Sequence, residues 1–98
     1  MNPIETFNTE CKNRIESQGK NEPLLQASKS FTEASIQSGY SFNFKWMGRP
    51  IIQYPQDIVA MQEIIWEIKP DLIIETGIAH GGSLIYYASL LELIGKGT

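Results

Sequence analysis

A glycine-rich segment over residues 75–83 carries the side chains best suited to chemistry, and it reads ETGIAHGGS. A glycine-rich turn between a strand and a helix lets the backbone approach a ligand closely, and it directs the free N–H groups of the helix start toward an anion. Dinucleotide sites use the spacing G-x-G-x-x-G to hold a pyrophosphate. That spacing is absent from this segment, which therefore predicts a ligand site of another kind.

The two ends of this segment favour a ligand that carries both charges. Glu75 would repel a pyrophosphate, but it could receive a cationic amine directly or through water. Ser83, beside the start of the following helix, could hold a carboxylate. The methionine end of S-adenosylmethionine carries an ammonium and a carboxylate on one carbon and meets both demands. Simpler roles stay open: Glu75 as a solvent-exposed strand end, the glycines as a plain turn, Ser83 as an N-cap, and His80 as a turn residue.

The hydrophobic pattern predicts the elements that position this segment. Residues 55–68 have apolar side chains at helical spacing between two prolines, so they predict an amphipathic helix. Residues 71–75 hold three consecutive branched apolar residues, which is typical of a strand buried on both faces. An apolar run over residues 84–94 predicts a second helix, which Gly95 and Gly97 would close. This order predicts an α/β fold, the N-terminal part of a Rossmann-like doubly wound parallel sheet.

The residues upstream give weaker signals. Residues 24–39 show a helical spacing of apolar residues that ends at Gly39. Aromatic residues alternate with polar ones over residues 40–46, as in a strand or an extended segment that lays one face on a core. Residues 47–55 predict a structured loop, while residues 1–23 define no apolar face. We therefore interpret residues 1–45 as a helical and extended N-terminal extension and residues 46–98 as the start of the ligand-binding domain.

Two stretches of the chain resemble known methyltransferases. Residues 75–83 are similar to motif I of class I methyltransferases, in the form E-x-G-x-x-x-G-x-S of the catechol and caffeoyl-CoA O-methyltransferases. The longer stretch from Trp46 to Leu91, with WMGRPIIQYPQD and QEIIWEIKPDLIIETG, resembles the cephalosporin hydroxylase/rhamnosyl O-methyltransferase family. The resemblance implies the class I methyltransferase fold and S-adenosylmethionine as the cofactor.

The resemblance also implies roles for individual residues. Glu75 would lie near the methionine amino group, and Ser83 would hydrogen-bond the methionine carboxylate. Gly77 would lend its backbone to the cofactor, and Gly81 would keep the turn tight. Gln53, in a loop over the same end of the cofactor, is the fifth candidate, with a purely structural role equally open.

The same resemblance implies a reaction but no catalytic residue in this chain. The methyl group would pass to a hydroxyl of a saccharide, a glycolipid or an antibiotic-like small molecule. A divalent metal such as Mg²⁺ would assist, with ligands further along the chain. We expect the 98-residue chain to be a truncated part of such an enzyme and to be inactive alone.

Composition excludes several other classes. The net charge is −3 with no basic run, so a nucleic-acid partner is not expected. The chain has one cysteine, Cys11, and neither a signal peptide nor an apolar stretch of membrane-spanning length, which favours the cytoplasm. A homo-oligomer stays open.

Two alternative functions stay open. The first is a non-enzymatic nucleotide-binding or interaction module, which the short length favours. The second is an esterase-like hydrolase, because residues 80–83 (HGGS) resemble an oxyanion turn. Against the hydrolase, the chain has no G-x-S-x-G nucleophile elbow, and Glu75 would oppose an oxyanion.

Overall fold

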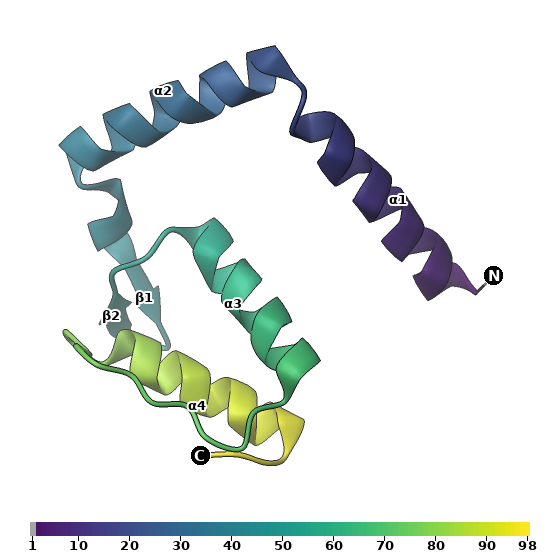
Figure 1. The fold of residues 1–98 in the computed structure, drawn as a ribbon. Helices are drawn as coiled ribbons and strands as arrows, with labels where there is room; N and C mark the ends of the chain where they lie inside the picture. The colour runs from purple at the N-terminus through teal and green to yellow at the C-terminus, as the bar shows by residue number, and fades with distance from the viewer. Residues whose placement is uncertain (1) are drawn as a thin grey trace. The chain divides into compact units, whose positions relative to one another are not determined.

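The computed structural model describes residues 2–98, which form helices, one short hairpin and an extended segment (Figure 1). The elements follow the order α1 (Pro3–Gln18), α2 (Glu22–Ser38), the 3₁₀ helix η1 (Tyr40–Asn43), β1 (Phe44–Trp46), β2 (Arg49–Ile51), α3 (Pro55–Ile68) and α4 (Gly82–Ile94). The chain divides into two compact units, one that extends to Gln37 and one from Ser38 to Thr98. None of the helices in the described part combines the length and hydropathy that crossing a bilayer requires.

The first unit consists of two helices whose starts are capped by asparagine. The side chain of Asn2 accepts a hydrogen bond from the Glu5 backbone N–H at 2.8 Å, and Glu5 accepts one from the Asn2 N–H at 3.3 Å. This reciprocal capping box, with Pro3 at the first helical position, starts α1. Asn21 caps α2 through the Leu24 N–H at 3.1 Å. The helix predicted over residues 24–39 is confirmed as α2, whereas α1 has no counterpart among the predicted helices.

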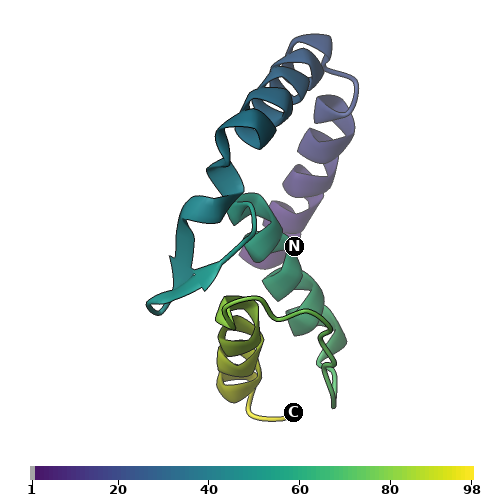
Figure 2. The same ribbon diagram turned by 90° about the vertical axis from the view of Figure 1, so that its left-hand side faces the viewer.

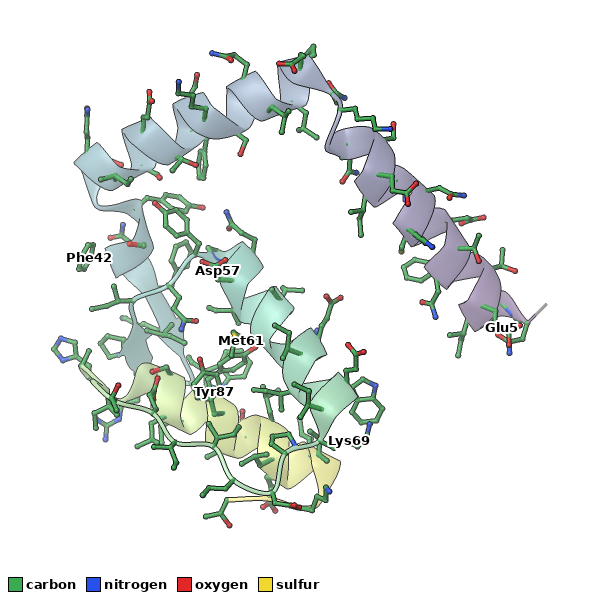
Figure 3. The ribbon with its side chains drawn as sticks, in the orientation of Figure 1. Glu5, Phe42, Asp57, Met61, Lys69 and Tyr87 are labelled. Carbon is green, nitrogen blue, oxygen red and sulfur yellow. The ribbon has the colours of Figure 1, made fainter. Side chains whose placement is uncertain are left out.

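The first part of the predicted loop, residues 47–51, forms the turn and second strand of a β-hairpin. β1 pairs antiparallel with β2, so that Phe44 lies opposite Ile51 and Trp46 opposite Arg49. Met47 and Gly48 connect the strands with φ angles of 48° and 84°, as a type I′ turn requires. The alternating aromatics upstream are a strand only from Phe44 onward. Before that the chain is the 3₁₀ helix η1, and Phe42 points away from the hairpin and helices of this unit (Figure 3).

The second unit builds its core from the hairpin and the two C-terminal helices. The predicted helix over residues 55–68 is confirmed as α3, with Asp57 in its first turn and Lys69 just after its end (Figure 3). The helix predicted over residues 84–94 is confirmed as α4. The buried apolar residues are Ile51 of β2, Ile65 of α3, and Tyr86 and Leu91 of α4. Because α4 supplies two of these four, it is the element on which the hairpin and α3 pack.

Tyr86 connects all three elements of this core. Its ring packs edge-on against Trp46 of β1, with ring centroids 4.7 Å apart, and its hydroxyl donates a hydrogen bond to the Ile58 carbonyl of α3. The Trp46 indole N–H in turn donates to the Ser89 hydroxyl of α4 at 3.2 Å. Edge-to-face aromatic pairs contribute about 0.5–1.5 kcal/mol beyond the area they bury.

The buried phenol makes the stability of this unit sensitive to alkaline pH. Burial, and next the neighbouring Tyr87, raise the pKa of Tyr86 above its ordinary value of 10.0. Because the folded state then holds its proton more tightly than the unfolded state, the stabilisation is complete below pH 10 and declines as pH rises further. We expect the urea midpoint of the wild type to fall above pH 10 more steeply than that of Tyr86→Phe. Parallel declines for the two proteins would contradict this assignment.

The prediction of a buried strand over residues 71–75 is wrong for this structure. Residues 70–81 form no strand, and Leu72 and Ile74 are 59% and 78% exposed. A strand requires a hydrogen-bonded neighbour, and the described residues offer this segment only Thr98. The Ile73 N–H donates to the Thr98 carbonyl at 2.7 Å, and the Thr98 N–H donates to the Asp71 carbonyl at 3.0 Å. The sheet in the described part is thus the antiparallel hairpin, and the predicted Rossmann-like parallel sheet is not present there.

The extended segment nevertheless places the glycine-rich turn against the hairpin. From the end of α3 it returns along α4 and reaches the start of α4 beside the hairpin, as both views show (Figures 1 and 2). Ile73 and Glu75 line a small cavity together with Leu84, Tyr87 and Leu91 of α4. Packing against α4 therefore positions Glu75 without a parallel sheet.

Candidate functional site

A cavity of about 230 Å³ lies between the end of β2 and the glycine-rich turn. Its walls come from three places: residues 50–53 at the end of β2 and just after it, the turn residues Glu75 and Gly77–Ala79, and Ser83 at the start of α4. Four of the five predicted cofactor-binding residues meet here, namely Gln53, Glu75, Gly77 and Ser83. Residues far apart in sequence thus converge on one site.

Two residues that line this cavity each have a buried side-chain oxygen without a hydrogen-bond partner in the described structure. The two atoms are Oε1 of Gln53 and Oε1 of Glu75. A buried polar atom without a partner costs about 1–3 kcal/mol relative to its solvated state. Both atoms belong to residues of the same cavity, so one ligand with several N–H donors could satisfy them together.

The second carboxylate oxygen of Glu75 is held by Ser83. The Ser83 hydroxyl donates a hydrogen bond to Oε2 of Glu75 at 2.5 Å. This bond fixes the carboxylate at the cavity wall and leaves its other oxygen as an acceptor. In this arrangement Ser83 positions Glu75, whereas the resemblance implied that Ser83 contacts a ligand carboxylate.

The glycines of the turn have distinct places. Gly77 lines the cavity with a φ of 75°, and a Cβ added there would meet open space. Gly81 is the N-cap of α4 with a φ of 84°, and its N–H donates to the Ile78 carbonyl at 2.7 Å. Gly81 lines a neighbouring cavity and not the one that holds the other four residues. Its predicted role in keeping the turn tight is compatible with this position.

Gly82 is a key residue that sequence reasoning did not single out. It is buried at the start of α4, and a Cβ added there would overlap the Pro50 carbonyl group and lie 2.9 Å from the Cα of Ile51. Real Cβ atoms essentially never approach other atoms this closely. The absence of a side chain therefore lets β2 contact α4, which closes one wall of the cavity. The Gly81-Gly82 doublet was the available signal.

The site's chemistry is that of an acceptor for cations. It offers the Glu75 carboxylate, and the buried Oε1 atoms of Gln53 and Glu75 have no hydrogen-bond partner. Ser83 donates to a carboxylate rather than to an imidazole, so the Ser–His pair that a hydrolase needs is not formed. In residues 2–98, no three His, Cys, Asp or Glu side chains gather to hold a metal ion.

Comparison with known proteins identifies the family of this chain. The family model "Rhamnosyl O-methyltransferase/CmcI" matches residues 38–98. The rhamnosyl O-methyltransferase of Mycobacterium leprae (strain TN) is 37% identical over 51 residues, which are 52% of this chain and 22% of the relative. Those of Mycobacterium bovis (strain BCG / Pasteur 1173P2) and Mycobacterium tuberculosis (strain ATCC 25177 / H37Ra) are also 37% identical over 51 residues, which are 52% of this chain and 21% of each relative.

The matched region contains the whole candidate site. The chain spans about a fifth of the length of these curated relatives, and no solved structure matches it. The family match covers residues 38–98 and so includes the hairpin, α3, the glycine-rich turn and α4. The chain belongs to the rhamnosyl O-methyltransferase/CmcI family.

Proposed function

We propose that this chain binds the amino-acid end of S-adenosylmethionine in the cavity of Gln53, Glu75, Gly77 and Ser83. In the whole protein it would thereby serve an O-methyltransferase that acts on a hydroxyl of a saccharide, a glycolipid or an antibiotic-like small molecule. Membership of a family named for rhamnosyl O-methyltransferases supports the reaction. The two unpartnered oxygens of the cavity support the cofactor.

The main observation behind this proposal is that two buried oxygens, Oε1 of Gln53 and Oε1 of Glu75, have no hydrogen-bond partner. A methionine ammonium has three N–H donors and a positive charge, and two residues of the cavity wall, Gln53 and Glu75, each have an Oε1 without a partner. Hydrogen bonds between an ammonium and a carboxylate contribute about 1.5–3 kcal/mol, more than bonds between neutral groups. Glu75 would instead repel a pyrophosphate, or a ligand carboxylate that took the place of the ammonium.

The size of the cavity limits which part of the cofactor it holds. Small-molecule sites commonly measure about 300–1,000 Å³, whereas this cavity measures about 230 Å³. It therefore suits the amino-acid end, while the nucleoside would extend past the cavity mouth. Bound S-adenosylmethionine would supply an electrophilic methyl group on a sulfonium, and this chain's residues would orient that group toward an acceptor.

A parallel backbone contact in the described part of the chain supports a larger parallel sheet in the whole protein. The two hydrogen bonds between residues 71–73 and Thr98 have the slanted pattern of parallel pairing. We infer that residues 46–98 begin the predicted Rossmann-like domain of the whole protein. Any divalent metal that assists the reaction would need ligands from outside residues 2–98, since these contain no suitable cluster.

A titration of the ¹⁵N-labelled chain with S-adenosylhomocysteine tests the proposed site. We expect saturable chemical-shift changes at the side-chain amide of Gln53 and the backbone amides of Gly77 and Ser83, with none in α1. Shifts spread evenly over the chain, or absent at millimolar ligand, would refute the site.

Ser83→Ala should weaken this binding without abolishing it. The substitution removes the donor to Oε2 of Glu75, so the carboxylate is no longer held in place. The loss of one such bond costs about 1 kcal/mol, or roughly five-fold in Kd. Ser30→Ala in α2, outside the cavity, is the matched control. Equal Kd values for Ser83→Ala and the control would show that Ser83 does not position the carboxylate.

A further inference from the structure

A second, larger cavity adjoins the proposed cofactor site. It measures about 490 Å³ and shares three wall residues, Pro50, Ile78 and Ala79, with the smaller cavity. The shared wall residues make the two cavities neighbours. A molecule in the second cavity would therefore lie next to one in the first.

The charges of the two cavities are opposite. Arg49 and His80 are the only polar side chains that line the second cavity, and no carboxylate lines it. Within residues 2–98, Arg49 forms no ion pair. Its guanidinium has five N–H donors that match a carboxylate or a phosphate, and the imidazole of His80 adds another. The first cavity, in contrast, contains Glu75.

The backbone reinforces this preference. Gly81, the N-cap of the 13-residue helix α4, also lines the second cavity, as does Leu84 in the first turn. The first N–H groups of a helix lack intrahelical partners and carry the positive end of its dipole. The cavity thus combines the permanent positive charge of Arg49, the imidazole of His80 and the start of α4. All three favour an anion.

The volume indicates an organic anion rather than an isolated ion. A carboxylate alone would fill a small part of 490 Å³, and a cavity of this size is typical of small-molecule sites. The remaining walls are apolar, from Pro50, Ile78, Leu84 and Ile85. We propose that this cavity receives a small organic molecule that bears a carboxylate or phosphate group. If the proposed function holds, on which this assignment rests, that molecule is the methyl acceptor.

A titration with two matched sugars and with phosphate tests this proposal on the chain itself. The ¹⁵N-labelled protein is titrated separately with glucuronate, with glucose and with inorganic phosphate, and shifts are followed at Arg49, Ala79, Gly81 and Leu84. We expect glucuronate and phosphate to produce saturable shifts at these amides, with glucose at least ten-fold weaker. Arg49→Gln should weaken glucuronate ten- to hundred-fold, the loss expected for a charged hydrogen bond, while Lys45→Gln, opposite Pro50 in the hairpin, should leave it unchanged.

Three results would overturn this assignment. Equal affinity for glucose and glucuronate, equal affinity of the wild type and Arg49→Gln, or absence of any binding would show that the cavity does not select anions. Arg49→Gln should keep the dispersed spectrum of the wild type, because Arg49 is exposed.

A competition arm separates the acceptor from the cofactor. The glucuronate titration is repeated with the chain saturated by S-adenosylhomocysteine. If the two bind together, the second cavity is an acceptor site. If they compete, the anion that Arg49 recognises is the carboxylate of the cofactor, and the acceptor assignment fails. If glucuronate binds but S-adenosylhomocysteine does not, the proposed function fails and the anion cavity stands.

Discussion

Gly82→Ala is expected to destabilise the chain by about 3 kcal/mol or more, the upper part of the range for overpacking a tight contact. The added Cβ would overlap the Pro50 carbonyl and press on the Cα of Ile51. These are backbone atoms, which cannot move aside as the end of a flexible side chain can. The hairpin would have to separate from α4, and this would open the wall of the proposed cofactor cavity. Urea denaturation followed by circular dichroism measures the change.

The neighbouring glycine supplies the control. Gly81→Ala places a Cβ in open space, so only the left-handed backbone conformation opposes it. That conformation costs a residue other than glycine about 1–2 kcal/mol. We therefore expect Gly82→Ala to be clearly the more destabilising of the two. Equal losses would mean that the contact between β2 and α4 does not stabilise this unit.

Glu75→Gln is expected to weaken S-adenosylhomocysteine binding ten- to hundred-fold. The substitution preserves the shape of the side chain and its ability to accept from Ser83, but it removes the negative charge that faces the ligand ammonium. A charged hydrogen bond of about 1.5–3 kcal/mol corresponds to this range of Kd. Isothermal titration calorimetry gives the value directly.

The control for this variant is Glu67→Gln, on the exposed surface of α3. It changes the net charge by the same amount and should leave Kd unchanged, so a general electrostatic effect would appear in both proteins. If Glu75→Gln binds as tightly as the wild type, the ammonium does not lie at Glu75, and the orientation of the cofactor proposed above is wrong.

Local signals predicted the helices well where prolines and glycines mark their ends. α3 begins at Pro55 and ends before Pro70, and α4 ends at Ile94, followed by its C-cap Gly95 with a φ of 91°. Each of these residues acts through its own backbone geometry, which no distant contact overrides. α1 was not predicted because its apolar residues form no clear face. Its start does carry a sequence signal, since Asn2 and Glu5 form a capping box and Pro3 stands at the first helical position.

The sheet could not be predicted in the same way, because strand pairing is not local. The apolar run over residues 72–74 indicates a strand only if other strands lie beside it. Within residues 2–98, this segment pairs only with Thr98. β1 lies in the segment predicted as a strand or extended, but the turn and β2 were predicted as a loop, because Met47-Gly48 lacks the usual Asn-Gly or Asp-Gly signature. Tertiary context, not propensity, decided both segments.

The candidate site was predicted as a set of residues but not as a geometry. The motif predicted Glu75 and Ser83 as site residues. The structure also brings Gln53, which precedes α3 in the chain, to the same cavity. That the Ser83 hydroxyl donates to Glu75 depends on the side-chain rotamers, and that Gly82 contacts Pro50 depends on how β2 packs. Neither follows from the spacing of the motif.

The most direct test of the central claim compares two ligands on the wild-type chain by calorimetry. S-adenosylhomocysteine carries the amino-acid end that the cavity is proposed to hold, whereas 5′-methylthioadenosine has the same nucleoside and lacks that end. If Gln53 and Glu75 receive the ammonium, S-adenosylhomocysteine should bind at least ten-fold more tightly. Equal affinities, or no binding of S-adenosylhomocysteine at millimolar concentration, would contradict the proposed cofactor site.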